Sequence, residues 1–140
     1  MNTPPFHLAY PVSNLEKART FFTATLGASE GRSAERWVDL NLFGHQLSLH
    51  LIDGDDINAS TNAVDGDQVP TLHFGCVLDW KQWQDNYETL CERDAEFIID
   101  KKIRFQGDVG EQGTYFVKGP CGIAIEFKSF KDPTQLFAAE

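Results

Sequence analysis

The two halves of this chain predict the same succession of secondary-structure elements. A strand is followed by a helix, a short strand and a hairpin, over about 5–52 in module one and about 71–130 in module two. Each helix is expected to begin six residues after a strand histidine, at Ser13 after His7 and at Asp79 after His73. This repeated βαβββ order predicts an α+β fold. Because 140 residues have room for one core, we expect the modules to pair into a single domain, 1–140, with a shared mixed sheet.

Local patterns place the elements within each module. Alternating apolar and polar residues predict strands, and apolar residues three or four positions apart predict helices. Ser13 and Glu16 have the spacing of a capping box, Gly27 suits the residue after a helix, and Asp79 suits an N-cap. A tight turn at Gly44-His45 joins two strands. The expected strands are 6–12, 28–33, 36–43, 46–52, 71–78, 97–99, 103–105, 113–118 and 123–130, and the expected helices are 14–26 and the segment from Asp79.

The segment 53–70 differs in composition from the rest of the chain. It holds five aspartates and two glycines and has no aromatic residue. Such a cluster predicts a surface loop, and its length is typical of a functional or mobile segment or of a connector. We therefore interpret 53–70 as a linker between the modules and 131–140 as a C-terminal tail.

Charge and cysteine content argue against several classes of function. With 12 Lys and Arg against 21 Asp and Glu, the net charge of −9 argues against nucleic acid or an anionic membrane as a partner. The three cysteines are widely spaced and form no CxxC pair, so we expect neither a disulfide framework nor a structural zinc cluster, and we expect Cys76 and Cys91 in the core. The sequence has no signal-peptide pattern and no apolar run of about 20 residues. It predicts a reduced, cytoplasmic protein.

Three polar residues lie at matching places in strands of the repeat. His7 and His73 lie in the first strand of each module, and Glu126 lies in the last strand of module two. Strand alternation turns all three toward the face opposite the helices. Two imidazoles and one carboxylate form the facial triad of non-haem Fe(II) enzymes, and Mn(II), Ni(II) or Zn(II) could occupy the same ligands. The alternative is two hydrogen-bonded strand histidines and a solvent-facing glutamate.

The chain resembles the glyoxalase/bleomycin resistance/extradiol dioxygenase superfamily, also called vicinal oxygen chelate proteins. The resemblance covers roughly 5–130 and is carried by FHLAYPVSNLEKARTFFTATLG and YFVKGPCGIAIEFK. A narrower group of predicted extradiol-type dioxygenases is similar to EGRSAERWVDLNLFGHQLSLHL, IRFQGDVGEQGTYF and EFKSFKDPTQLF. The resemblance implies two βαβββ modules that form a cup-shaped sheet. It also implies one divalent metal, Fe(II) by expectation, held by His7, His73 and Glu126.

The sequence departs from the family pattern at two places. Residues 119–123 read Gly-Pro-Cys-Gly-Ile where Asp-Pro-Ser-Gly-Asn is usual, a change in a turn that leaves the ligand assignment intact. The last strand of module one, Gln46-Leu47-Ser48-Leu49-His50, lacks the glutamate that serves glyoxalase I-like enzymes as a fourth ligand. This absence counts against glyoxalase I activity. His50 has the parity of Ser48, so we consider it as an acid/base, a fourth ligand or an ordinary strand residue.

Four further residues are candidates for substrate binding. Arg104 could hold a carboxylate or phosphate, or form a surface ion pair. Lys128 shares the face of Glu126, and Thr114 and Phe116 share a parity that lines the cup. Tyr115 has the opposite parity and is not expected to be a catalytic tyrosine. His45 is expected to be structural or solvent-facing.

These residues favour an extradiol-type dioxygenase acting on a small catechol-like or vicinal-oxygen substrate. The alternatives are a glyoxalase-like lyase or isomerase, and a metal-free protein that binds a small molecule such as an antibiotic, as in bleomycin resistance. The resemblance also implies a homodimer.

Overall fold

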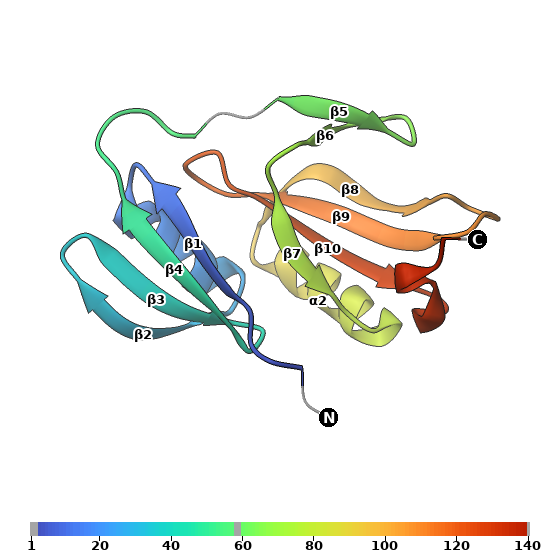
Figure 1. Ribbon diagram of the computed structural model, residues 1–140, viewed down its shortest axis with the longest axis horizontal. Helices are drawn as coiled ribbons and strands as arrows, with labels where there is room; N and C mark the ends of the chain where they lie inside the picture. Colours follow the sequence, from blue (N-terminus) through green and yellow to red (C-terminus); the bar gives the residue numbers. More distant parts are fainter. Residues whose placement is uncertain (1–2, 58–59, 140) are drawn as a thin grey trace. The chain divides into compact units, whose positions relative to one another are not determined.

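The computed structural model describes residues 3–57 and 60–139. Within them the chain divides into two compact units (Figure 1). Unit 1 contains residues up to 57 together with Gly119–Gly122, and unit 2 contains 60–118 and 123–139. Residues 58 and 59 of the expected linker, and residues 1–2 and 140 at the ends, lie outside the described residues.

Unit 1 is a four-stranded mixed sheet with one helical segment on one face (Figure 1). The strands lie in the order β1-β4-β3-β2, with β1 parallel to β4 and the other neighbours antiparallel. Alternation turns buried residues such as Val12 and Leu49 toward the helical face. The elements are β1 (His7–Val12), α1 (Leu15–Thr20), the π-helical segment η1 (Phe21–Thr25), β2 (Ser29–Ala34), β3 (Trp37–Leu42) and β4 (His45–Leu51).

The first helix begins one residue later than the capping pattern predicts. Asn14 is the N-cap, and its side chain accepts a hydrogen bond of 3.0 Å from the backbone N–H of Lys17. Ser13 instead donates to the carboxylate of Asp56, a partner 43 residues away that no local pattern contains. The predicted N-cap at Ser13 is therefore wrong, whereas Gly27, with φ 80°, follows the helical segment as expected.

Unit 2 is a second four-stranded mixed sheet, in the order β7-β10-β9-β8. β7 is parallel to β10, and the other neighbours are antiparallel. The Asp79 carboxylate accepts from the backbone of Gln82, whose side chain accepts in turn from the backbone of Asp79, so the predicted cap of the second helix is confirmed. The elements are β5 (Thr61–Val64), β6 (Asp67–Pro70), β7 (Phe74–Val77), α2 (Trp80–Glu92), β8 (Glu96–Arg104), β9 (Gln112–Lys118), β10 (Ala124–Phe130) and the 3-10 helix η2 (Pro133–Phe137).

The predicted α+β fold with two βαβββ modules is confirmed. Among the described strands, the backbone hydrogen bonds form two four-stranded sheets, one per module, where we expected a shared sheet. Residues 61–70 form the hairpin β5–β6, so the interpretation of all of 53–70 as loop is wrong. β8 is one irregular strand across 96–104, where we expected two short strands around a turn. The hairpin turn of unit 1 lies at Phe43-Gly44, and His45 begins β4.

The core of unit 2 is aromatic and fixes which face of the sheet carries Glu126. The buried Trp83 of α2 stacks on Tyr115 at 5.3 Å between ring centroids, and its indole N–H donates to the carbonyl of Phe127. Phe127 and Tyr115 therefore face α2, and Glu126, with the opposite parity, points away. Cys91 is exposed rather than in the core, because Leu90 takes the buried position of the last helical turn. In the part of the chain that the structure describes, no helix is long and apolar enough to span a membrane.

Candidate functional site

His73 and Glu126 face each other across two parallel strands of unit 2. His73 immediately precedes β7, and Glu126 lies in the middle of β10, opposite Gly75. The Nε2 atom of His73 is 3.3 Å from Oε1 of Glu126. The strands approach so closely that a β-carbon at Gly75 would overlap the carbonyl oxygen of Glu126. Glycine at this position therefore permits the distance between the two side chains.

Each member of the pair has a second partner that orients it. Nδ1 of His73 is 2.7 Å from the carbonyl oxygen of Pro70. The hydroxyl of Thr114, which is fully buried on β9, donates to Oε2 of Glu126 at 2.7 Å. The ring of Phe116 packs edge-on against the imidazole, with 4.9 Å between ring centroids. The orientation of both side chains is therefore set by neighbours and not by solvent.

The hydrogen bond to Pro70 determines what the pair can bind. A carbonyl oxygen only accepts, so Nδ1 of His73 carries the proton. Nε2 then presents either a lone pair or a second N–H to the Glu126 carboxylate. A lone pair 3.3 Å from a carboxylate oxygen is repulsive, so the arrangement calls for a cation between the two, either a proton or a metal ion.

The electrostatics of the protein agree with this reading. The hydrogen bond to Glu126 raises the pKa of His73, against the opposing effect of burial. Burial alone would raise the pKa of Glu126, but hydrogen bonds from His73 and Thr114 and the nearby charge of Lys128 together lower it. Glu126 is therefore an anion that holds a positive partner.

The residues of unit 2 fit a divalent metal ion. Ligands about 2.1 Å from a metal and about 90–105° apart are separated by roughly 3.0–3.3 Å, which matches the Nε2–Oε1 distance of 3.3 Å. An imidazole whose other nitrogen donates to a carbonyl, and a carboxylate held by a hydroxyl, are typical of metal sites. Among the described residues, no group of three or more His, Cys, Asp and Glu side chains lies close enough to hold a metal. The third predicted ligand, His7, lies exposed at the start of β1 in unit 1, so its part in the triad stays a prediction.

The register of unit 1 shows what occupies the positions equivalent to Glu126 and Lys128. His7 pairs with Gln46, and the register of β7 with β10, extended by one residue, pairs His73 with Ala124. Two residues further along each last strand lie Ser48 and Glu126.

Ser48 is therefore the counterpart of Glu126 within the repeat, and His50, exposed near the end of β4, is the counterpart of Lys128. Ser48 is buried and donates to the Asp39 carboxylate at 2.5 Å. Asp39 pairs with Ser48 on the neighbouring strand, as Phe116 pairs with Glu126 in unit 2. Sequence reasoning missed the hydrogen-bonded pair of Ser48 and Asp39, because the match depends on strand register.

Two other predicted residues have partners outside the His73–Glu126 pair. The guanidinium of Arg104 is only 3% exposed, donates to the carbonyl of Val64 at 2.9 Å and forms an ion pair with Asp67 at 3.0 Å. It is thus engaged by the β5–β6 hairpin and is not presented to a substrate. His45 accepts a 2.7 Å hydrogen bond from the backbone N–H of Phe6, which fits the expected structural role.

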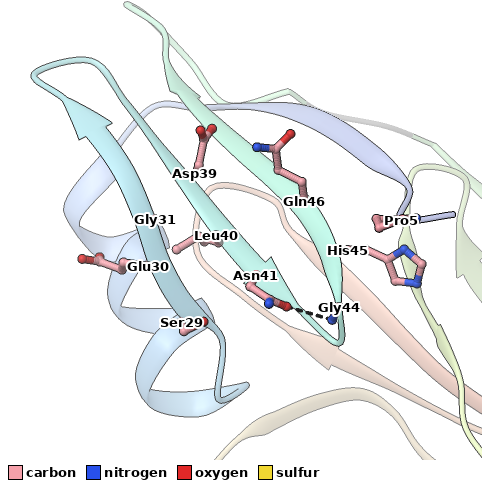
Figure 2. Close-up of a pocket in the computed structure, with 10 residues that line it drawn as sticks. All are labelled: Pro5, Ser29, Glu30, Gly31, Asp39, Leu40, Asn41, Gly44, His45 and Gln46. Atoms are coloured by element: carbon pink, nitrogen blue, oxygen red, sulfur yellow. Dashed lines mark hydrogen bonds between the residues drawn. The ribbon is translucent and has the colours of Figure 1, made fainter.

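Unit 1 also has a polar pocket of about 380 Å³ beside its β3–β4 turn. Figure 2 shows Asp39 and Gln46 projecting from adjacent strands, and the side chain of Asn41 accepting a hydrogen bond from Gly44 at 2.8 Å. Since Gln46 is the register partner of His7, these polar groups lie on the same sheet face as His7. The pocket is lined by Pro5, Ser29, Glu30, Gly31, Asp39, Leu40, Asn41, Gly44, His45 and Gln46.

Comparison with known proteins identifies the family. No family model and no curated protein sequence matches the chain. Among solved structures, a glyoxalase/bleomycin resistance protein/dioxygenase from Alicyclobacillus acidocaldarius is 30% identical, covers 96% of both chains and superimposes with a TM-score of 0.82.

A second solved structure shares the fold at lower identity. The fosfomycin resistance protein FosX from Listeria monocytogenes is 16% identical over 97% of this chain and 100% of its own, with a TM-score of 0.68. A mutant of FosX has been solved with Mn(II) and 1S,2S-dihydroxypropylphosphonic acid. On the 30% identity to the Alicyclobacillus protein over nearly the full length of both chains, this chain belongs to the glyoxalase/bleomycin resistance protein/dioxygenase family.

Proposed function

We propose that this protein is a metal-dependent enzyme in which His7, His73 and Glu126 hold one divalent metal ion. The observation that carries the proposal is the His73–Glu126 pair, in which a nitrogen and a carboxylate oxygen 3.3 Å apart require a cation between them. The outer partners, Pro70 and Thr114, leave one lone-pair atom of each ligand free to point inward.

Within the family we infer an extradiol-type dioxygenase that acts on a small substrate with two vicinal oxygens, such as a catechol. The proposed ligand set, two imidazoles and one carboxylate, is that of non-haem Fe(II) oxygenases. When bound, the metal would lower the pKa of a substrate hydroxyl and bring substrate and dioxygen together. Lys128 supplies positive charge two residues from Glu126, and the buried ring of Phe116 supports the imidazole of His73 from the core. His50 is the proposed proton carrier.

A glyoxalase-like lyase or isomerase reaction is the second candidate. It is favoured by the FosX structure that contains Mn(II) and a dihydroxy phosphonic acid, a compound with two vicinal oxygens. The two reactions differ in whether dioxygen is consumed, so a measurement of oxygen uptake separates them.

The first experiment tests metal binding. Protein purified without chelators is analysed for metal and then titrated with Fe(II), Mn(II), Ni(II) and Zn(II) while its thermal unfolding is followed. We expect one metal per chain and a raised Tm, and the loss of both in H73A and E126Q. S129A is the matched control, because Ser129 is buried on the strand that carries Glu126 and its hydroxyl has no hydrogen-bond partner within the described residues. If the wild type neither holds a metal nor responds to any of the four, the enzyme proposal is refuted.

The second experiment tests the reaction. The Fe(II)-loaded protein is mixed with a panel of catechols under an oxygen electrode. We expect uptake of one dioxygen per catechol consumed with at least one member of the panel. Metal binding without oxygen uptake on any catechol would reject the dioxygenase and leave the lyase or isomerase as the function to pursue.

A further inference from the structure

We propose that the β5–β6 hairpin is a clamp that positions His73, with Asp67 as its anchoring residue. The inference rests on the proposed function, because it treats His73 as a metal ligand. The hairpin belongs to the same unit as the His73–Glu126 pair, and its last residue, Pro70, lies three residues before His73. Asp67 is thus a positioning residue that acts through the backbone of β6.

The polar half of the clamp joins the hairpin to β8. The carboxylate of Asp67 lies 2.8 Å from Nζ of Lys102 and 3.0 Å from the guanidinium of Arg104. Arg104 also donates to the carbonyl of Val64, so one buried guanidinium contacts both strands of the hairpin. The hydrogen bond from Lys102 holds the pKa of Asp67 below its usual range. Arg104 is so nearly excluded from solvent that losing its carboxylate partner would leave a buried charge uncompensated.

The apolar half of the clamp reaches the ring that packs on His73. Val69 of β6 is buried against Ile99 and Phe116, and Val64 packs on the same cluster. Phe116 in turn contacts the imidazole edge-on at 4.9 Å. A hairpin that lifts from β8 and β9 therefore also removes the packing behind the ring that supports His73.

The last residue of the hairpin, Pro70, supplies the carbonyl oxygen that determines the tautomer of His73. Asp67, Val69 and Pro70 belong to one short extended strand, so the contacts of the first two fix the place of the third. The carbonyl of Pro70 holds Nδ1 of His73 at 2.7 Å and leaves Nε2 directed at Glu126. The backbone N–H and hydroxyl of Thr71 both donate to the carbonyl of Ser60, which ties the end of β6 to the start of the hairpin. Displacement of β6 would release Nδ1 and allow the other tautomer.

The test weakens the contacts of the hairpin in two unrelated ways and measures the tautomer of His73 and the affinity for Mn(II). D67N removes the charge of the anchor, and V69A removes its apolar contact without changing charge. We expect both to speed hydrogen exchange of the hairpin amides. In the metal-free protein, at a pH high enough to leave His73 neutral, we expect nitrogen NMR to show its imidazole changing from one Nδ1–H tautomer in the wild type to a mixture of tautomers in the variants. Calorimetric titration with Mn(II) should show affinity about tenfold weaker, the lower end of the effect of removing an outer partner of a ligand.

Two control variants separate the clamp from general damage. T61V removes a hydrogen bond of 3.1 Å to Gln68 within the hairpin and leaves its contacts with β8 and β9, so it should match the wild type in all three readouts. D67E keeps the carboxylate and should recover part of the Mn(II) affinity lost in D67N. If D67N does not fold, V69A alone decides the question.

Two results would overturn the inference. One is faster exchange of the hairpin with unchanged His73 tautomer and Mn(II) affinity, and the other is unchanged exchange in both D67N and V69A. A wild type that binds no metal refutes the proposed function but leaves the tautomer measurement to judge the clamp.

Discussion

Replacement of Thr114 by valine isolates the hydrogen bond that orients Glu126. Valine has nearly the same shape and lacks only the hydroxyl that donates 2.7 Å to Oε2 of Glu126 from a fully buried position. A hydrogen bond to a charged group contributes about 1.5–3 kcal/mol. Loss of an outer partner of a metal ligand lowers affinity about 10- to 100-fold, which corresponds to about 1.4–2.7 kcal/mol. The two estimates agree, so T114V should raise the Kd for Mn(II) 10- to 100-fold.

The assay is calorimetric titration of Mn(II) into T114V, the wild type and S129A. Ser129 is a fair control because it is also fully buried, lies on the same strand as Glu126, and has a hydroxyl without a hydrogen-bond partner within the described residues. S129A should bind Mn(II) as the wild type does. An affinity in T114V equal to or tighter than that of the wild type would refute the reasoning, since it would mean that Thr114 withdraws charge from the carboxylate instead of holding it in place.

The remaining predictions concern packing, capping and pH. G75A should lower the free energy of unfolding by about 1–3 kcal/mol in urea titrations and weaken Mn(II) binding, because β7 must move away from Glu126; unchanged binding would contradict the close approach. N14A should lower the free energy of unfolding by about 1 kcal/mol, because Asn14 is the N-cap of α1. If S13A reduced the hydrogen-exchange protection at the start of α1 as much as N14A does, Ser13 would be the N-cap instead. The stability difference between the wild type and D67N should be constant above about pH 5 and shrink below about pH 4. The sign follows because the folded pKa of Asp67 is lowered, so its contribution is complete above the unfolded pKa and is lost as pH falls through the folded one. A difference that persists to pH 2 would contradict it.

Periodicity and capping residues predict most elements of this fold correctly, because these signals depend on neighbours in sequence. The cap at Asp79 is complete within four residues, and it forms as predicted. The cap at Ser13 fails because a distant aspartate, Asp56, takes the serine hydroxyl. The hairpin at 61–70 had a local signal, the Asp65-Gly66 pair, whose positive φ angles of 44° and 87° suit a tight turn. The aspartate-rich composition of the surrounding segment favours a loop, so composition and turn signal conflict at 61–70.

The sequence predicts which residues share a face at the candidate site, but it does not predict which of them are paired by hydrogen bonds or ion pairs. Strand parity predicts Glu126, Thr114 and Phe116 on one face, and in the structure Glu126 and Phe116 contact His73 while Thr114 donates to Glu126. The same reasoning could not show that Arg104 is committed to Asp67, 37 residues earlier in the sequence, because an ion pair of this kind depends on the docking of a hairpin that the sequence analysis had interpreted as loop. Arg104, which we predicted to bind substrate, thus stabilises the hairpin next to His73, the proposed metal ligand.

The two units carry different residues at equivalent positions, a serine in one and a glutamate in the other. This difference affects the net charge of the proposed site. Ser48 stands where unit 2 has Glu126, and the carboxylate nearest to it, that of Asp39, is already hydrogen-bonded to the serine. In the proposed ligand set, a divalent ion held by two neutral imidazoles and one carboxylate keeps a net charge of about +1. A second glutamate from unit 1 would cancel that charge. With a hydroxyl at Ser48 instead, the proposed site would keep that charge and would attract an anionic substrate with two oxygens, despite a net charge of −9 on the whole chain.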